Sequence, residues 1–204
     1  MAYDIPPHLV SDRFSPPVDT VYISADKDKK SFRGGLQITT NYSPHATENA
    51  TQDGIVVHIP LSVSDKYPLE ISEGDHVYTH HFLCDSDTSL QLNGEFLYPM
   101  DYRWHIFCKI VDGEPVMIRD WNLIEPYNDT KDYRGDSGLY LTASQGHSGK
   151  YGIAKYINKE LRNTGIKEGD LIVFNQDSDY PIEVEGELLF RMRNRDIDAV
   201  ITSS

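Results

Sequence analysis

Ser137 is the side chain whose surroundings look most like those of a catalytic nucleophile, because it stands in Gly135-Asp136-Ser137-Gly138. A serine hydroxyl attacks a carbonyl only when a histidine accepts its proton and a third group orients that histidine. None of the 8 histidines stands in the Ala-Ala-His-Cys context that surrounds this base in serine proteases. We therefore interpret 135–138 as a turn before a strand and expect no catalytic residue.

Five potential metal ligands lie close together in the sequence: His76, His80, His81, Cys84 and Asp85. On an extended strand, His76 and His80 share a face but lie ~13 Å apart at ~3.3 Å per residue, and His81 is on the opposite face. Neighbours on one strand therefore chelate a metal ion poorly, although a cross-strand partner such as His58 stays open. We expect ordinary strand histidines and no metal.

Residues 144–151 (Ser-Gln-Gly-His-Ser-Gly-Lys-Tyr) have a superficial likeness to a phosphate-binding loop. The first glycine is not at the required spacing, and no Ser or Thr follows Lys150 to bind magnesium. No pair of carboxylates stands out for acid–base catalysis either. We expect a flexible loop here, no cofactor and no enzymatic activity.

The composition is that of an ordinary globular protein, with 204 residues, 39% hydrophobic and 25% charged residues, and a net charge of −13. This charge argues against a nucleic-acid partner, because such binding depends on Lys and Arg neutralising phosphates. No apolar leader or membrane-length apolar run is present, so we expect no membrane partner and a cytoplasmic protein. The 13 Tyr and 7 Phe, with many β-branched residues, favour strands.

One strand pattern occurs twice, about ninety residues apart, which suggests duplicated β units. Ile71–Tyr78 and Ile166–Phe174 both read as a polar Gly-Asp turn that leads into a strand. Val111–Glu114 and Val184–Glu187 both contain Gly-Glu, and each is followed by an apolar strand with arginine. Asp112-Gly113 between alternating apolar residues also predicts a hairpin.

The second copy resembles the carboxyl half of a GroES-type co-chaperonin. The matching residues are Gly169, Asp170, Gly186, Glu187, Leu189, Met192, Arg193, Asp196, Ile197, Ala199 and Val200. In the first copy, Pro17–Ile23 is similar to the family's opening strand, and the spacing to Gly34-Gly35 also matches. The resemblance covers roughly residues 17–201 and implies an all-β fold of two tandem GroES-like small β-barrels.

The resemblance also implies a partner-binding site in each copy. In the family, a Gly-flanked mobile loop docks on a GroEL-type chaperonin through the outer apolar residues of a tripeptide. The corresponding residues here are Gly35, Leu36, Gln37 and Ile38 in the first copy and Gly138, Leu139, Tyr140 and Leu141 in the second. Two apolar residues at i and i+2 share one face of an extended segment, so they can enter a groove together. Many weak loops arranged in a ring compensate through multivalency.

The domain bounds that follow are an extended arm (1–17), a first barrel (18–121) with a long loop (26–54), and a second barrel (122–204) with a loop (128–151). Residues 122–126 would have to serve as the last strand of one copy and the first strand of the next. We therefore predict that the two barrels share one strand at the junction.

Three features depart from the family pattern. Gln37 is polar where the tripeptide is normally apolar. The connections Leu61–Leu69 and Lys159–Gly165 are short, so the family's roof hairpin is expected to be reduced or absent. The segment between Asp85 and Trp104 reads as an insertion without a family counterpart.

The function implied is a non-enzymatic, homo-oligomeric ring that caps a GroEL-type chaperonin and assists protein folding. The alternative is a structural subunit of a phage virion, or of another large assembly, that contacts neighbouring subunits through the same barrels. The sequence leaves a phage origin open; the protein would then lie in the host cytoplasm or in the virion.

Overall fold

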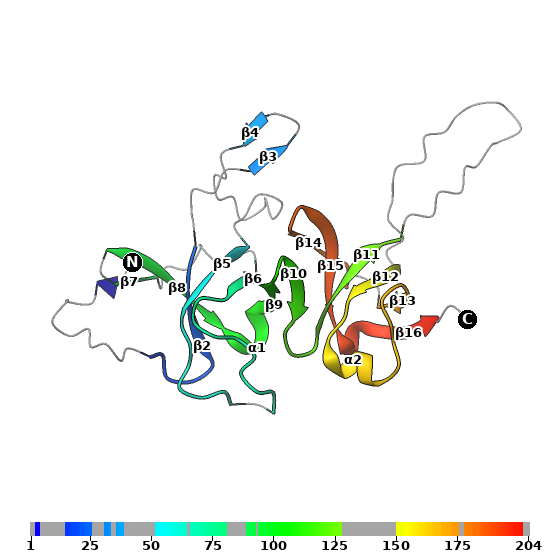
Figure 1. The fold of residues 1–204 in the computed structure, drawn as a ribbon, viewed down its shortest axis with the longest axis horizontal. Coiled ribbons are helices and arrows are strands. Elements are labelled where there is room, and N and C mark those ends of the chain that lie inside the picture. Colours follow the sequence, from blue (N-terminus) through cyan, green and yellow to red (C-terminus); the bar gives the residue numbers. More distant parts are fainter. Residues whose placement is uncertain are drawn as a thin grey trace, which may run out of the picture. The chain divides into compact units, whose positions relative to one another are not determined.

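The structure is a computed structural model, and it describes residues 3–4, 15–25, 31–33, 36–38, 52–64, 66–80, 89–92, 94–127, 150–175 and 178–201. The chain divides into two compact units, unit 1 (Met1–Arg119) and unit 2 (Asp120–Ser204), and each unit holds its own β-sheet (Figure 1). Strands dominate both units, so the all-β fold expected from the sequence is confirmed.

Unit 2 is one six-stranded sheet in the order β14-β15-β11-β12-β13-β16. Its elements are β11 (Trp121–Pro126), β12 (Tyr151–Tyr156), α2 (Lys159–Asn163), β13 (Leu171–Phe174), β14 (Tyr180–Val184), β15 (Glu187–Arg193), the 3-10 helix η4 (Asn194–Asp196) and β16 (Ile197–Ile201). Residues 151–161 comprise strand β12, a short connection and the beginning of α2.

Unit 1 contains an eight-stranded sheet in the order β1-β7-β8-β2-β5-β6-β9-β10. Its elements are β1 (Tyr3–Asp4), β2 (Thr20–Ser24), β5 (Asp53–His58), β6 (His76–Thr79), β7 (Leu90–Leu92), β8 (Glu95–Asp101), α1 (Tyr102–His105), β9 (Ile106–Val111) and β10 (Glu114–Met117). A separate two-stranded ribbon is formed by β3 (Ser31–Arg33) and β4 (Leu36–Ile38).

Six strands of unit 1 repeat the sheet of unit 2. The order β7-β8-β2-β5-β6-β9 becomes β14-β15-β11-β12-β13-β16 when each strand is replaced by the one at the same place in the other unit. The bulges are repeated as well. The pairing of β2 with β5 is interrupted by a bulge between Tyr22 and Ile23, and the pairing of β11 with β12 by a bulge between Leu123 and Ile124. A β-bulge inserts one residue and bends its strand, so a bulge at the same place gives both sheets the same local bend.

The two cores use equivalent positions. Unit 1 buries Val21, Ile23, Val56, Ile71, Val77, Tyr98, Met100, Tyr102, Ile106 and Ile118 in its main cluster. Unit 2 buries Ile124, Ala154, Ile157, Leu161, Ile172, Phe174, Phe190 and Met192. Ile23 pairs with Tyr98 in unit 1, and Ile124 pairs with Phe190 at the same place in unit 2. The two cores are therefore built from apolar residues at equivalent strand positions.

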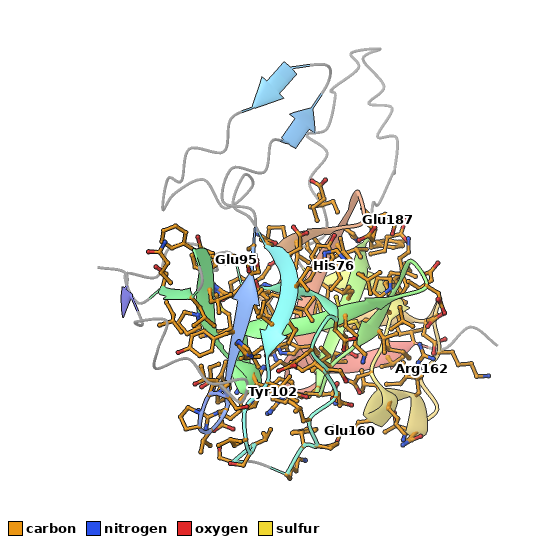
Figure 2. All side chains as sticks on the ribbon, turned by 60° about the vertical axis from the view of Figure 1, so that its left-hand side comes forward. His76, Glu95, Tyr102, Glu160, Arg162 and Glu187 are labelled. Carbon is orange, nitrogen blue, oxygen red and sulfur yellow. The ribbon has the colours of Figure 1, made fainter. Side chains whose placement is uncertain are left out.

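The hairpin equivalence expected from the sequence is wrong. In the structure, β14 and β15 join through Val184 and Glu187, and the strands at that place in unit 1 are β7 and β8, which join through Leu92 and Glu95. Glu95 and Glu187, labelled in Figure 2, each begin the second strand of this hairpin. The segment interpreted as an insertion therefore contains the counterpart of the family's Gly-Glu hairpin.

Asp112-Gly113 does form the predicted hairpin turn, between β9 and β10. Both residues have positive φ, at 53° and 84°, as a two-residue hairpin loop of this type requires. However, β9 is the counterpart of β16, the last strand of unit 2, so this hairpin follows the repeat instead of belonging to it.

The predicted shared strand is also wrong, for the same reason. β11 pairs with β15 on one edge and with β12 on the other, and both partners belong to unit 2. Unit 1 already has its sixth strand in β9, so its sheet does not need residues 122–126. The shortage of residues that suggested a shared strand came from assigning the wrong hairpin to the first copy.

A glycine stands where the first and second strands of each six-stranded repeat approach most closely. A Cβ at Gly54 would lie 2.6 Å from both Ile23 Cγ2 and the backbone oxygen of Ser24. A Cβ at Gly152 would clash with Ile124 Cγ2 and lie 2.9 Å from the backbone oxygen of Glu125. Both strands of each pair are held in a sheet, so neither backbone can retreat cheaply, and glycine is required by space.

Substitution of Gly152 by alanine tests this close approach. Gly152→Ala should lower the free energy of unfolding by roughly 1–3 kcal/mol, because the added methyl overpacks a tight site. Chemical denaturation followed by far-UV circular dichroism would measure the loss. In an Ile124→Ala background the same substitution should cost less, because one of the two clashing groups is gone. An unchanged denaturation midpoint for Gly152→Ala would contradict the close approach.

Candidate partner-binding site

The two predicted binding segments occupy the same connection in the two sheets. The first leaves the end of β2 and returns at β5, and the second leaves the end of β11 and returns at β12. Because β2 and β11 are equivalent strands, as are β5 and β12, both segments leave the same end of the same strand pair. Gly35, Gly138, Leu139, Tyr140 and Leu141 lie outside the described residues, so their predicted role stays a prediction.

Leu36, Gln37 and Ile38 form strand β4, which pairs antiparallel with β3. The register places Ser31 opposite Ile38, Phe32 opposite Gln37 and Arg33 opposite Leu36. The backbone of the predicted tripeptide is thus already paired along one edge.

The return of the first segment to the sheet is held by backbone and side-chain hydrogen bonds. Thr79 donates to the Gln52 carbonyl oxygen through its amide (2.6 Å) and through its hydroxyl (3.3 Å). His76 Nε2 lies 3.0 Å from Asp53 Oδ2. At the equivalent place in unit 2, the Phe174 amide donates to the Lys150 carbonyl at 3.1 Å. The backbone hydrogen bond at the point where the segment rejoins the sheet is thus found in both units. The hydrogen bond from the Thr79 hydroxyl and the contact between His76 and Asp53 belong to unit 1.

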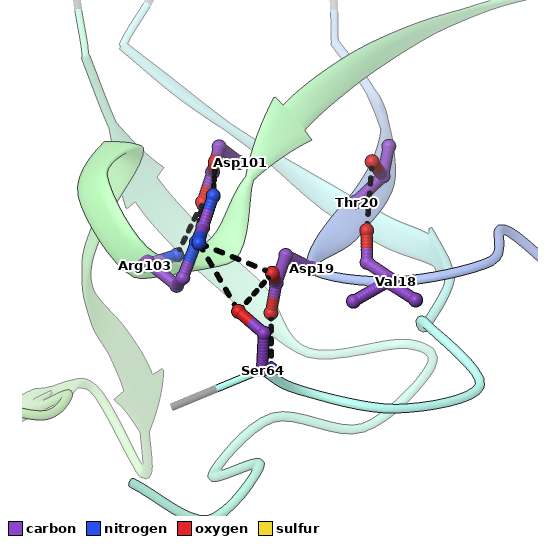
Figure 3. Close-up of polar contacts among 6 residues, drawn as sticks. All are labelled: Val18, Asp19, Thr20, Ser64, Asp101 and Arg103. Atoms are coloured by element: carbon purple, nitrogen blue, oxygen red, sulfur yellow. Dashed lines mark hydrogen bonds and ion pairs between the residues drawn. The ribbon is translucent and has the colours of Figure 1, made fainter. Parts of the chain in front are cut away.

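At the other end of β2, a buried carboxylate ties the strand to the β5–β6 connection (Figure 3). Asp19 is 7% exposed and accepts hydrogen bonds from the backbone amide of Ser64 at 2.7 Å and from the Ser64 hydroxyl. Arg103 of α1 lies 3.3 Å from Asp19 and also donates twice to Asp101, at 2.7 and 3.1 Å. Two parallel hydrogen bonds from one guanidinium to one carboxylate hold the Arg103 side chain in a single orientation. One arginine therefore links the start of β2, the connection and the end of β8.

Arg103 also sets the ionisation of Asp101. Burial alone would raise the pKa of this carboxyl, but hydrogen bonds from the Arg103 side chain and backbone, with the charge of the guanidinium, outweigh burial and lower the pKa below its ordinary value of 3.8. The ionised form of Asp101 is thus the form that stabilises this end of unit 1.

Unit 2 ties the start of β11 to the corresponding connection with neutral groups. Asn122 is 0% exposed, and its Oδ1 accepts from the Asn158 amide at 2.9 Å and from Asn158 Nδ2 at 3.0 Å. Asn158 also caps α2 by accepting from the Leu161 amide at 2.9 Å, and both asparagines donate to Asn194 Oδ1. The three amides satisfy one another, as buried polar groups must.

No hairpin stands in the β12–β13 connection of unit 2: α2 occupies this place, and its charged residues Glu160 and Arg162 are labelled in Figure 2. In unit 1 the described residues between β5 and β6 contain no strand. There the buried Tyr102 holds the connection, because its hydroxyl donates to the Pro68 carbonyl and accepts from the Glu70 amide. The roof hairpin of the family is absent from the described part of both connections.

The described residues contain no group of three or more His, Cys, Asp or Glu that could hold a metal ion. Within the same residues, no helix has the length and apolar character needed to cross a membrane. Of the five ligand candidates in the sequence, His81, Cys84 and Asp85 lie outside the described residues. His76 bonds to Asp53, and the His80 ring lies 5.7 Å from that of His105.

Sequence reasoning missed the residues that position the loops. Asp19 and Arg103 belong to no motif, and their link depends on a contact between residues 84 positions apart, which no local pattern signals. The β7–β8 hairpin did carry a signal, since Asn93-Gly94 is an Asn-Gly pair followed by an alternating strand.

Comparison with known proteins supports the assignment of unit 2. A family model described as chaperonin 10 kD subunit matches residues 116–201, which include all of β11 to β16. A search of curated proteins found no match to the chain. The match supports a GroES-type domain in unit 2, and six strands of unit 1 repeat its strand order.

The Asp101 carboxylate gives a pH-dependent prediction. Because its pKa is lower in the folded chain than 3.8, its stabilising effect is complete above about pH 4 and is lost as the pH falls through the folded value. Asp101→Asn should therefore cost roughly 1–2 kcal/mol at pH 7 and progressively less below pH ~4, measured by denaturation across that range. The exposed Asp198 of β16 serves as control, and Asp198→Asn should cost little at either pH. A pH-independent loss for Asp101→Asn would contradict this role.

Proposed function

We propose that the protein is a ring-forming, co-chaperonin-like protein that caps a GroEL-type chaperonin and assists protein folding. The observation that carries the proposal is the chaperonin 10 match over residues 116–201, together with the repeat of that domain's strand order in unit 1. Because of this repeat, each unit has its long connection at the place where the family carries its mobile loop. The proposed contacts are Leu36 and Ile38 in unit 1 and Leu139 and Leu141 in unit 2.

The proposed chemistry is apolar burial supplemented by main-chain pairing. Leu and Ile at i and i+2 of an extended segment enter one groove, and the backbone between them can pair with a partner strand. The buried polar clusters described above tie strands to connections in both units. The proposed function is therefore binding.

A double substitution tests the capping function. Leu36→Ser with Leu139→Ser should abolish capture by a purified GroEL-type chaperonin in the presence of ATP and remove any effect on its ATPase, because both anchors are lost. Binding would be measured by co-sedimentation and by ATPase rate. Leu61→Ser is the matched control, since Leu61 is 76% exposed in unit 1 and lies outside both tripeptides.

The same experiment separates capping from a structural role in a virion or another large assembly. If the wild-type chain neither joins the chaperonin complex nor alters its ATPase, the capping function is wrong. The double variant should still assemble in that case, because packing between barrels does not use the tripeptides. The polar Gln37 and the missing roof hairpins are the features that favour this second function.

Unequal sheet edges support self-assembly through unit 2. In unit 1 the outer edge of β9 is covered by β10, in a register that pairs Pro115 with Ile110 and Val116 with Lys109. The equivalent strand of unit 2, β16, pairs with β13 alone among the described residues, and Ile201 on it is 55% exposed. An open, partly apolar edge strand is a ready template for pairing with another chain.

Ile201→Lys should weaken this proposed assembly, because a charge placed on an edge strand opposes pairing with a second chain. The mass and symmetry of the native assembly, measured by native mass spectrometry, should shift toward smaller species. Leu61→Lys, at an exposed apolar position of unit 1, should leave the mass unchanged. Identical masses for wild type and Ile201→Lys would remove β16 as the assembly edge.

A further inference from the structure

One face of the unit 2 sheet is apolar in three neighbouring strands, although it is not the face that forms the core. Strands β12, β13 and β16 lie side by side (Figure 1), and Ile172 of β13 packs in the core together with its pairing partner Val200. Successive residues of a strand alternate between the two faces of a sheet, so the neighbours of this row lie on the opposite face. We call this opposite face the outer face; its members are Tyr151, Ile153, Leu171, Val173, Ala199 and Ile201.

The outer face is accessible in the single chain. Tyr151 is 40% and Ile201 is 55% exposed, Ala199 is exposed, and the other three members are half-buried. An antiparallel sheet with one face in water usually carries polar residues on that face, whereas strands that are covered on both faces are apolar throughout. The residues of the outer face are thus typical of a sheet that is covered on both sides.

Unit 1 carries polar side chains on the corresponding face. The pairing registers make Asp53 equivalent to Tyr151 and His76 equivalent to Leu171. His76 Nε2 lies 3.0 Å from Asp53 Oδ2, so a polar pair stands where unit 2 has two apolar side chains. The apolar character of the outer face is therefore a property of unit 2 and not of the repeat.

Unit 1 also buries part of the corresponding face. Tyr78 and Cys108, which are equivalent to Val173 and Ala199, are 7% and 0% exposed. This position of the repeat thus accepts a cover of packed protein groups. In unit 2 the cover has to come from another molecule, because the single chain leaves Ala199 exposed.

We propose that the outer face of unit 2 binds a second copy of this chain, which lies across β12, β13 and β16. The inference rests on the proposed function, because it deepens the proposed self-assembly through unit 2. Ile201 belongs both to the outer face and to the edge strand β16, so the two surfaces are continuous.

The geometry of edge pairing supports this choice of partner. A second copy that adds a strand beside β16 is a folded body, and this body has to lie on one side of the joined sheet. On one side, Ile197 and Val200 of β16 pack against the core of unit 2. The outer face is the side that remains for the second copy.

The charge of the chain favours contact at a face without charged groups. Each copy has a net charge of −13, so two copies repel each other when they approach within about a Debye length. None of the six members of the outer face is charged, so close contact there places no carboxylates opposite each other. Apolar burial at this face supplies the attraction.

Two variants with the same change of net charge test the proposal. Tyr151→Glu places a carboxylate on the outer face, and Leu188→Glu places one on β15, at a position that is 48% exposed and outside that face. Tyr151→Glu should raise the dissociation constant of the assembly about tenfold or more, because a carboxylate enclosed in an apolar contact loses its water. Leu188→Glu should change it less than about twofold. Sedimentation equilibrium of the full chain without chaperonin measures both constants.

Tyr151 separates the outer face from the edge. Neighbouring strands are ~4.8 Å apart, so Tyr151 on β12 lies about 14 Å from a strand added beside β16, and edge pairing alone leaves it untouched. If the wild-type chain assembles and Tyr151→Glu assembles as well as Leu188→Glu, the outer face has no role and assembly through the edge stands. If the wild-type chain stays monomeric, self-assembly fails and the outer face falls with it. If the chain does not bind the chaperonin but Tyr151→Glu alone disperses the assembly, capping fails and the present inference stands.

A neutral change at the same position guards against a variant that fails to fold. The thiol of Tyr151→Cys should react with a maleimide about fivefold more slowly, or less, at assembling than at dissociating concentrations, because the second copy covers it. Leu188→Cys should react at the same rate at both concentrations. Peptide mass spectrometry follows each introduced cysteine separately from the native ones. Equal rates for Tyr151→Cys at concentrations where the chain assembles would overturn the proposal.

Discussion

The close approach of the first two repeat strands is the constraint on which the rest of each unit depends. In both sheets a bulge bends the first strand, and a glycine on the second strand lies where any side chain would strike an isoleucine and a backbone oxygen. The loop that connects these strands begins and ends just beyond this point. The place at which the proposed binding segments leave each sheet is therefore fixed by backbone packing that only glycine permits.

The other end of the first strand is anchored by different chemistry in the two units. Unit 1 uses the charged groups Asp19, Asp101 and Arg103, and unit 2 uses the amides of Asn122 and Asn158. Both sets tie the start of the strand to a connection between the second and third strands. Both units thus need this end of the strand to be anchored. In unit 1 an ion pair offsets the cost of burying charged groups, and unit 2 avoids that cost by using neutral amides. As a result, only the anchor of unit 1 is sensitive to acid.

Additional strands distinguish the two sheets. β1 and β10 extend the sheet of unit 1 beyond its six repeated strands, and the described part of unit 2 has no counterpart to either. Covered edges resist pairing with other chains, and open edges invite it. In the proposed ring, unit 2 therefore provides the assembly edge.

The sequence alone determined the class of the fold and the GroES-type pattern of unit 2. Strand propensity, turn residues and the spacing from Gly169 to Val200 are local features, and each reports directly on the backbone that it favours. The Asp112-Gly113 turn was predicted correctly for the same reason. The positions of Leu36 and Ile38 at i and i+2 could also be found without a structure.

Only the tertiary structure decided which hairpin belongs to the repeat, which strands border β11 and which residues of β3 pair with β4. These are questions of pairing between distant strands, and two hairpins with equally good turns cannot be ranked by local signals. Leu92–Glu95 and Val111–Glu114 both carry Gly-Glu and close hairpins of the same register, yet only the first lies at the place in the sheet that β14 and β15 occupy in unit 2. Local chemistry determines that a turn forms, and non-local hydrogen bonding and core packing determine where it belongs.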